Sequence, residues 1–99
     1  MKTAEEIKHI AYQVIEDEKK AVAMLSDYID NGFVEAVDSI FSATGRVIVT
    51  GIGKSANIAQ KIVSTLNSTG TPALFLHAAD AIHGDLGMVQ PHDIVLCIS

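Results

Sequence analysis

The sequence predicts an α/β domain built on a parallel, three-layer αβα sheet that is preceded by a pair of helices. Apolar residues recur at intervals of three and four through residue 43, and short β-prone runs then alternate with helical patterns. Strands separated by helices pair in parallel through right-handed crossovers. We therefore expect residues 1–44 to form a helical hairpin and residues 45–99 to form the first βαβαβ part of the sheet domain.

Two amphipathic helices are expected in the N-terminal region. The first carries an apolar stripe from Ile7 to Ile29, and Asn31-Gly32 supplies its stop signal. The second covers residues 33–43 and ends at Gly45. A long amphipathic helix ahead of a sheet either packs over that sheet or contacts a neighbouring subunit, and we expect a mixture of both roles.

The remaining elements alternate along the chain. They are strand 46–50, helix 54–68, strand 73–76, a short helix near 79–82 and strand 93–98. The last strand is a nearly continuous apolar run, which is typical of a parallel strand covered on both faces. Since no helix follows it, we expect the 99 residues to be the truncated, N-terminal part of a longer domain.

Composition argues against several classes of function. The net charge of −5 opposes nucleic-acid binding, which depends on clustered Lys and Arg. No apolar run approaches the roughly 18 residues of a membrane span, and no signal-peptide core follows the polar N-terminus. The single cysteine, Cys97, cannot form an internal disulfide. We expect a cytoplasmic protein, and the 48% hydrophobic content suggests that some apolar surface meets another chain or further sequence.

The most informative motif is the strand, turn and helix start at residues 47–55, whose turn reads Gly51-Ile-Gly-Lys-Ser55. Such a turn presents free backbone N–H groups and the positive end of a helix dipole, which suit a phosphate. A Walker A loop would need glycine where Ile48 stands, so a nucleoside triphosphate cradle is excluded.

Two other ligands remain for this turn. Gly51, Gly53 and Ala56 satisfy the dinucleotide pattern G-x-G-x-x-G/A, but His77 stands where an acidic residue would hold a ribose. The alternative ligand is a sugar phosphate, which needs support from segments further along the chain.

That support comes from Ser68-Thr-Gly-Thr-Pro72 and from the segment 77–91, which includes His83-Gly-Asp-Leu-Gly-Met-Val89. Together with the glycine turn, these segments resemble the arabinose-5-phosphate isomerases of the KpsF/GutQ type, a branch of the sugar isomerase (SIS) domain superfamily. The resemblance extends from about residue 18 to residue 99. It implies a flavodoxin- or Rossmann-like SIS fold and a homo-oligomer, either a dimer or a tetramer.

The resemblance also implies an activity. The expected reaction interconverts D-arabinose 5-phosphate and D-ribulose 5-phosphate through an enediolate, requires no cofactor and feeds Kdo and lipopolysaccharide biosynthesis. Lys54 matches the catalytic lysine of the family, and its ammonium would neutralise the enediolate or contact the sugar oxygen. His77 matches a metal-ligand position, which implies possible zinc binding. Residues that match substrate-binding positions are Ser55, Gly70, Thr71, His83 and Ser99.

Several of these residues also have a purely structural interpretation. Lys54 is alternatively a solvated lysine, although a cation in the first turn of a helix is mildly unfavourable. Ser55 is equally well explained as a helix N-cap, and Gly70 as a helix C-cap. A single histidine such as His77 is weak evidence for a metal, because zinc usually has three or four protein ligands.

Two further classes of function stay open at this point. One is a non-catalytic SIS module that senses a sugar phosphate, and the other is a dinucleotide-binding domain. Further family site residues would lie beyond Ser99, so we expect the isolated 99 residues to be inactive.

Overall fold

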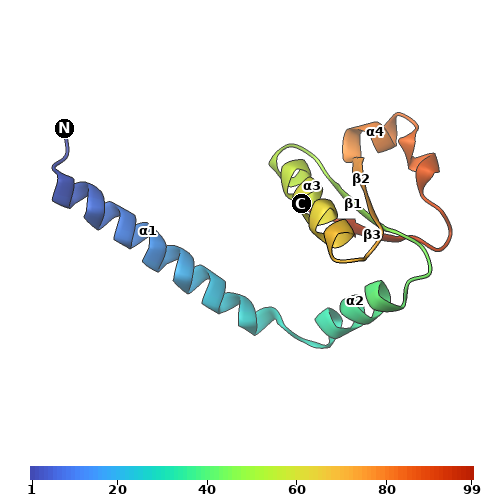
Figure 1. Cartoon of the computed structure of the whole chain (residues 1–99), viewed down its shortest axis with the longest axis horizontal. Helices are drawn as coiled ribbons and strands as arrows, with labels where there is room; N and C mark the ends of the chain where they lie inside the picture. Colours follow the sequence, from blue (N-terminus) through green and yellow to red (C-terminus); the bar gives the residue numbers. More distant parts are fainter. The chain divides into compact units, whose positions relative to one another are not determined.

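The structure is a computed structural model that describes all 99 residues. They divide into two compact units, Met1–Ala36 and Val37–Ser99. The helices and strands labelled in Figure 1 are α1 (Ala4–Met24), α2 (Asn31–Ser42), β1 (Val47–Gly51), α3 (Lys54–Ser68), β2 (Ala73–His77), α4 (Ala78–Ile82) and β3 (Ile94–Cys97). Two short 3-10 turns, η1 (Leu25–Tyr28) and η2 (Asp85–Met88), complete the chain. The boundary between the units falls within α2, and the hairpin expected for residues 1–44 stays a prediction.

Helix α1 begins with a capping box. The Thr3 hydroxyl accepts from the Glu6 N–H at 3.2 Å, and the Glu6 carboxylate accepts from the Thr3 N–H at 3.1 Å. This arrangement satisfies two of the N–H groups that a helix start leaves without partners. No residue of α1 is buried, so its apolar stripe from Ile7 onward finds no cover within this unit.

The junction between α1 and α2 differs from the sequence-based expectation. Helix α1 ends at Met24, and Asn31-Gly32 opens α2 where we predicted a stop signal, so that prediction was wrong. The reason is Asp30, whose Oδ1 accepts from the Phe33 N–H at 3.1 Å and so caps the start of the new helix.

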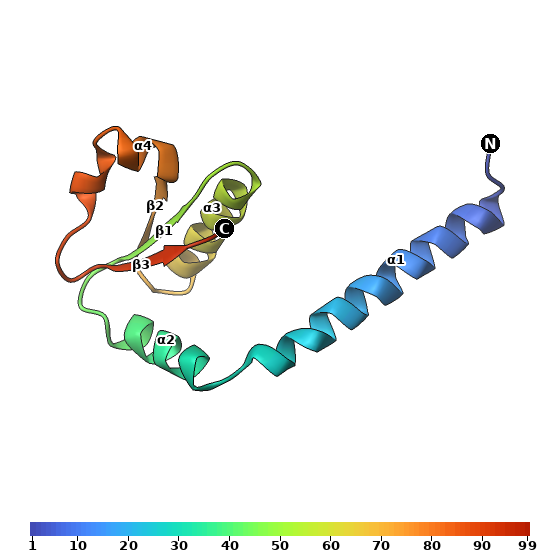
Figure 2. The ribbon, with the colours of Figure 1, turned by 180° about the vertical axis from the view of Figure 1, so that it is seen from behind.

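The second unit contains a parallel three-stranded sheet in the order β2-β1-β3, with β1 in the centre (Figure 2). The parallel α/β fold is thus confirmed, and α3 has the predicted bounds. The strands begin or end within one residue of the predicted ranges. Helix α3 covers one face of the sheet, where Val47, Val49, Ala59 and Ala73 form the core. On the other face of the edge strand β3, Val95 is 47% exposed.

An ion pair ties the start of β1 to the start of β3. The Asp93 carboxylate accepts from the backbone N–H of Arg46 at 2.8 Å, from Nη2 of Arg46 at 3.1 Å and from the N–H of Gln90 at 2.8 Å. Its side chain is only 2% exposed. The N–H of Gln90, followed by the side chain and N–H of Arg46, lowers the pKa of Asp93 from its ordinary 3.8 to about 2.

Gly45 lets the chain pass close to this ion pair. A Cβ at position 45 would collide with the backbone carbonyl of His92 and would lie 2.8 Å from Oδ1 of Asp93. Only glycine therefore fits between the end of α2 and the turn that leads into β3.

We predict that Asp93→Asn destabilises the protein above pH 4 and weakens its acid dependence. Because folding depresses the pKa of Asp93, the stability that this carboxylate contributes is complete above its ordinary pKa of 3.8 and is lost as the pH falls towards 2. Thermal unfolding midpoints between pH 2 and pH 6 test this. Asp38→Asn, an exposed control in the same unit, should follow the wild type. An Asp93→Asn curve parallel to that of the wild type would contradict the prediction.

We also predict that Gly45→Ala lowers the free energy of unfolding by about 1–3 kcal/mol, the usual cost of overpacking. The atoms in the way belong largely to backbone and to a fixed carboxylate, so they cannot rotate aside. Urea denaturation measures the change, with Gly87→Ala as the matched control because nothing lies within 4 Å of a Cβ there. Equal midpoints for the two variants would refute the close contact.

Candidate functional site

The carboxyl ends of the three strands meet at one edge of the sheet. Gly51 at the end of β1 pairs with His77 at the end of β2, and Thr50 pairs with Cys97 of β3. Ligands of parallel α/β sheets bind at this edge. The loops that leave these strands therefore form the candidate site.

The turn after β1 leaves the start of α3 without a side-chain cap. Its N-cap residue is Gly53, with φ 60° and ψ −130°, a backbone conformation that glycine adopts without strain. No acceptor in the chain bonds the N–H groups of Lys54 and Ser55. These groups and the helix dipole are therefore available to an anion.

Gly51 brings this helix start close to the strand. A Cβ at Gly51 would lie 2.9 Å from the carbonyl carbon of Ser55 and 3.2 Å from the nitrogen of Ala56. Backbone atoms occupy the space, so a larger residue would push the first turn of α3 away from the sheet edge. Two glycines thus place the open N–H groups beside the end of the central strand.

Lys54 and Ser55 occupy the first two positions of α3. Lys54 is exposed and takes part in none of the ion pairs of the chain. The interpretation of Ser55 as the N-cap was wrong, because Gly53 holds that position and the Ser55 hydroxyl makes no hydrogen bond within the chain. Both side chains are free to meet a ligand at this edge.

His77 closes β2 and starts α4. Its Nδ1 accepts from the N–H of Ala79 at 3.1 Å, so the imidazole caps α4. The ring also lies edge-on to Phe75, with centroids 6.2 Å apart. Sequence reasoning missed this cap because histidine is not among the residues that favour N-caps.

His83 and Ser99 are both exposed. His83 ends α4, and its N–H donates to the Asp80 carbonyl at 3.1 Å. Ser99 follows β3, whose pairing with β1 continues through the bond from the Ile98 N–H to the Thr50 carbonyl at 2.9 Å. Ser99 thus leaves the sheet at the same edge as the glycine turn.

Gly70 and Thr71 lie at the opposite end of α3. Gly70 has φ 94° and donates to the Asn67 carbonyl at 3.4 Å, while the Thr71 N–H donates to the Leu66 carbonyl at 2.9 Å. This is a Schellman motif in which Thr69 is the C-cap and Gly70, which we expected in that role, takes the next position. Helix α3 has 15 residues and is about 22 Å long, so one chain does not bring Gly70 and Lys54 together.

A cavity of about 270 Å³ lies beside this motif, at the amino edge of the sheet. It is lined by Ile40, Phe41, Ala43, Gly45, Val47, Gly70, Thr71 and Pro72. No titratable side chain faces it, so the cavity offers apolar surface, backbone groups and one hydroxyl. It offers no acid or base for catalysis.

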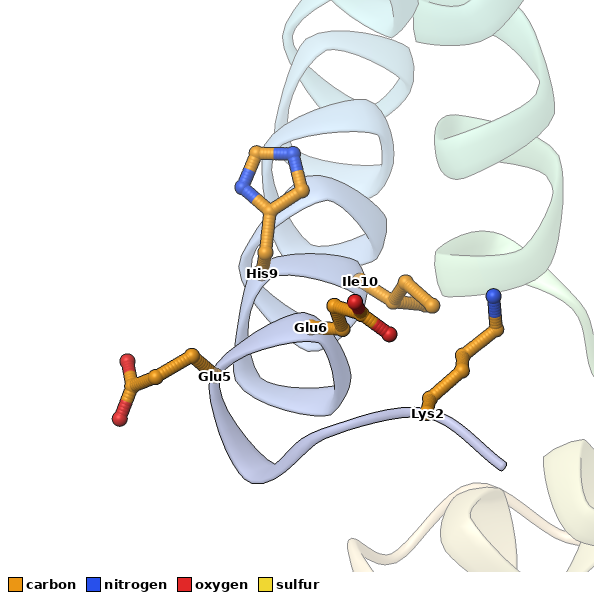
Figure 3. A pocket seen from close by; sticks show the side chains of 5 residues that line it. All are labelled: Lys2, Glu5, Glu6, His9 and Ile10. Carbon is orange, nitrogen blue, oxygen red and sulfur yellow. The ribbon is translucent and has the colours of Figure 1, made fainter.

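A larger hollow, of about 420 Å³, lies along the first turns of α1 (Figure 3). It is lined by Lys2, Glu5, Glu6, His9 and Ile10. The carboxylate of Glu6 is engaged in the capping box, and Glu5 pairs with Lys8 at 3.4 Å. In Figure 3, Glu5 and His9 project away from Lys2, so the charged groups do not converge on one point.

The residues around His77 do not fit the zinc site that the resemblance implied. The structure places no three His, Cys, Asp or Glu side chains together so that they would hold a metal ion. His77 moreover engages Nδ1 in the cap of α4.

One further polar group stands out near the site. The Thr50 hydroxyl is buried at the end of β1 and has no hydrogen-bond partner. It lies on the sheet face opposite α3, because side chains alternate along a strand and Val49 belongs to the core beneath α3. Sequence reasoning gave Thr50 no role.

A parallel α/β sheet whose central strand leads through a glycine turn into an uncapped helix defines a domain of the αβα class, and such turns are suited to bind phosphates. Residues 39–99 match the SIS domain. The chain belongs to the SIS domain family.

Known proteins similar to this chain carry a consistent name. Arabinose 5-phosphate isomerase KdsD of Yersinia pestis is 51% identical over 87 residues, which are 88% of this chain and 26% of that protein. Arabinose 5-phosphate isomerase GutQ of Escherichia coli K12 is 43% identical over 96 residues, or 97% of this chain and 30% of that protein. The chain thus spans about a quarter to a third of the length of these relatives.

Among solved structures, the c3406 protein of E. coli CFT073 in complex with arabinose 5-phosphate is similar, with a TM-score of 0.91 and 38% identity. The match covers 99% of this chain and 52% of that chain.

A separate feature of the helices is their polarity: none has the length and apolar character needed to cross a membrane.

We predict that Ser55→Ala leaves the free energy of unfolding nearly unchanged, whereas Gly53→Ala lowers it by about 1–3 kcal/mol. An N-cap serine would cost about 1 kcal/mol on removal, but Ser55 bonds no backbone N–H. Alanine at position 53 must adopt φ 60°, which strains an L-residue even though nothing lies within 4 Å of its Cβ. Urea denaturation compares the two variants, and a large loss for Ser55→Ala would restore its capping role.

Proposed function

We propose that the full-length parent of this chain is an aldose–ketose isomerase that interconverts D-arabinose 5-phosphate and D-ribulose 5-phosphate. The observation that carries the proposal is Lys54, exposed and unpaired at the uncapped start of α3, directly after the central strand. The names of the similar isomerases and the arabinose 5-phosphate complex of the similar structure support the choice of substrate.

The reaction needs three events, and residues of this chain are suited to the second of them. A base removes the proton at C2, positive groups stabilise the enediolate, and a proton returns to C1. The Lys54 ammonium and the N–H groups at the start of α3 suit the stabilising role. Removal of one preorganised donor of this kind typically slows turnover by about 10²- to 10³-fold. We assign the base to residues beyond this chain.

Other residues of the site are proposed as substrate contacts. Ser55, His83 and Ser99 all follow the carboxyl edge of the sheet and are free to offer a hydroxyl or imidazole to the ligand. Gly70 and Thr71 lie about 22 Å from Lys54 along α3, further than one pentose phosphate extends. If they contact substrate, they do so in the site of a second copy.

This separation supports a homo-oligomer, a dimer or tetramer, as does the exposed apolar stripe of α1. We also place the reaction in the cytoplasm and in Kdo and lipopolysaccharide biosynthesis, on the strength of the resemblance to the KpsF/GutQ isomerases. A sugar-phosphate sensor is the alternative that binds the same ligand without turning it over.

We predict that Lys54→Ala lowers kcat of the full-length parent by about 10²- to 10³-fold without unfolding it. Incubation with arabinose 5-phosphate in D₂O, followed by NMR, reports turnover and deuterium entry at the exchanging carbon together. Lys61→Ala is the matched control, since Lys61 is exposed on the same helix and has no ion pair. Unchanged turnover in Lys54→Ala would remove its catalytic role, and a wild type that binds without turnover would indicate a sensor.

A further inference from the structure

The hydrogen bond that caps α4 decides which nitrogen of His77 carries the proton. A backbone N–H is always a donor, so the Nδ1 atom that accepts from Ala79 at 3.1 Å must be unprotonated. In a neutral imidazole the proton then lies on Nε2. The fold of the β2–α4 junction thereby selects the Nε2–H tautomer of His77.

His77 lies at the same edge of the sheet as the candidate site. Ala73 and Phe75 pack on the sheet face covered by α3, and alternation along β2 places His77 on that face as well. His77 is also in register with Gly51, where the glycine turn begins. With Nδ1 turned to α4, Nε2 lies on the far side of the ring from that helix.

The Nε2 atom is free within the chain. It makes no hydrogen bond. If it were also buried, it would be a buried side-chain atom without a partner, but the Thr50 hydroxyl is the single atom of that kind. Nε2 therefore reaches solvent although the residue as a whole is partly buried. A half-buried donor of fixed tautomer is suited to bind an oxygen of a ligand at this edge.

We propose that His77 is a substrate-binding hydrogen-bond donor, held as the Nε2–H tautomer by its cap on α4, and not a zinc ligand. The ligand of this donor is an oxygen of the sugar phosphate, and for that ligand the inference rests on the proposed function. A metal-binding histidine normally donates its second N–H to an acceptor. Zinc on Nε2 would instead force the proton onto Nδ1, where it would face the N–H of Ala79 and break the cap.

The tautomer is tested first, without substrate. We label the histidines of the full-length protein with ¹⁵N and record long-range proton–nitrogen correlations, identifying His77 by the signal that disappears in His77→Asn. We expect an unprotonated Nδ1 and a protonated Nε2, both unchanged when Zn²⁺ is added. A protonated Nδ1, or displacement of the Nε2 proton by Zn²⁺, would overturn the proposal.

The donor role is tested with variants that separate it from the cap. Asparagine is a favoured N-cap, so His77→Asn retains an acceptor for Ala79 but loses the imidazole donor, whereas His77→Ala loses both. We expect His77→Asn to keep the wild-type unfolding midpoint and to lower kcat/KM by about 10- to 100-fold, the range for a hydrogen bond to a charged ligand. His92→Asn is the control, because His92 is exposed and outside the site. Wild-type kcat/KM in His77→Asn overturns the donor role.

A failure of the proposed function is distinguishable from a failure of this inference. If the wild-type protein turns over no arabinose 5-phosphate, the isomerase assignment fails while the tautomer spectrum still decides the state of His77. In that case the same sugar phosphate is titrated into the labelled protein. A shift of the His77 Nε2–H signal, absent in the His92 signal, supports the donor role, and no shift at saturation overturns it.

Discussion

The structure of the second unit depends on the burial of its central strand. Val47, Ile48 and Val49 are at most 1% exposed, with a strand on either side and α3 across one face. Full burial of such a side chain contributes about 1.5–3 kcal/mol. Because β1 is paired on both sides in fixed register, burial also determines which residues share the carboxyl edge.

Polar groups are paired at the amino edge of the sheet and lack partners at the carboxyl edge. At the amino edge, Asp93 accepts three hydrogen bonds from Arg46 and Gln90, and the Arg46 guanidinium neutralises its charge. At the carboxyl edge, the N–H groups that start α3 and the ammonium of Lys54 have no partners. An acidic chain therefore still offers a local positive site, because nearby dipoles and charges decide such a contact.

The sequence predicted the sheet and α3 well because strong local signals mark their boundaries. Gly53 and Gly70, each with positive φ, bracket α3 at positions where other residues would be strained. Prediction failed where one residue type fits two roles. Asn31-Gly32 is a stop signal by composition, but Asp30 turned it into a helix start. The predicted bounds of α3 already implied the separation of Gly70 from Lys54, because a helix of 15 residues is about 22 Å long.

The sheet face opposite α3 is only partly covered within this chain. Parallel strands are usually covered on both faces. Here Val95 and Cys97 of β3 are exposed, and the Thr50 hydroxyl paired beside Cys97 has no partner. The similar solved structure matches nearly all of this chain with only 52% of its own. We expect further residues of an SIS domain to cover the β3 part of this face, where Val95 and Cys97 are exposed. The free N–H groups at the start of α3 are available to the sugar phosphate that we propose as the ligand.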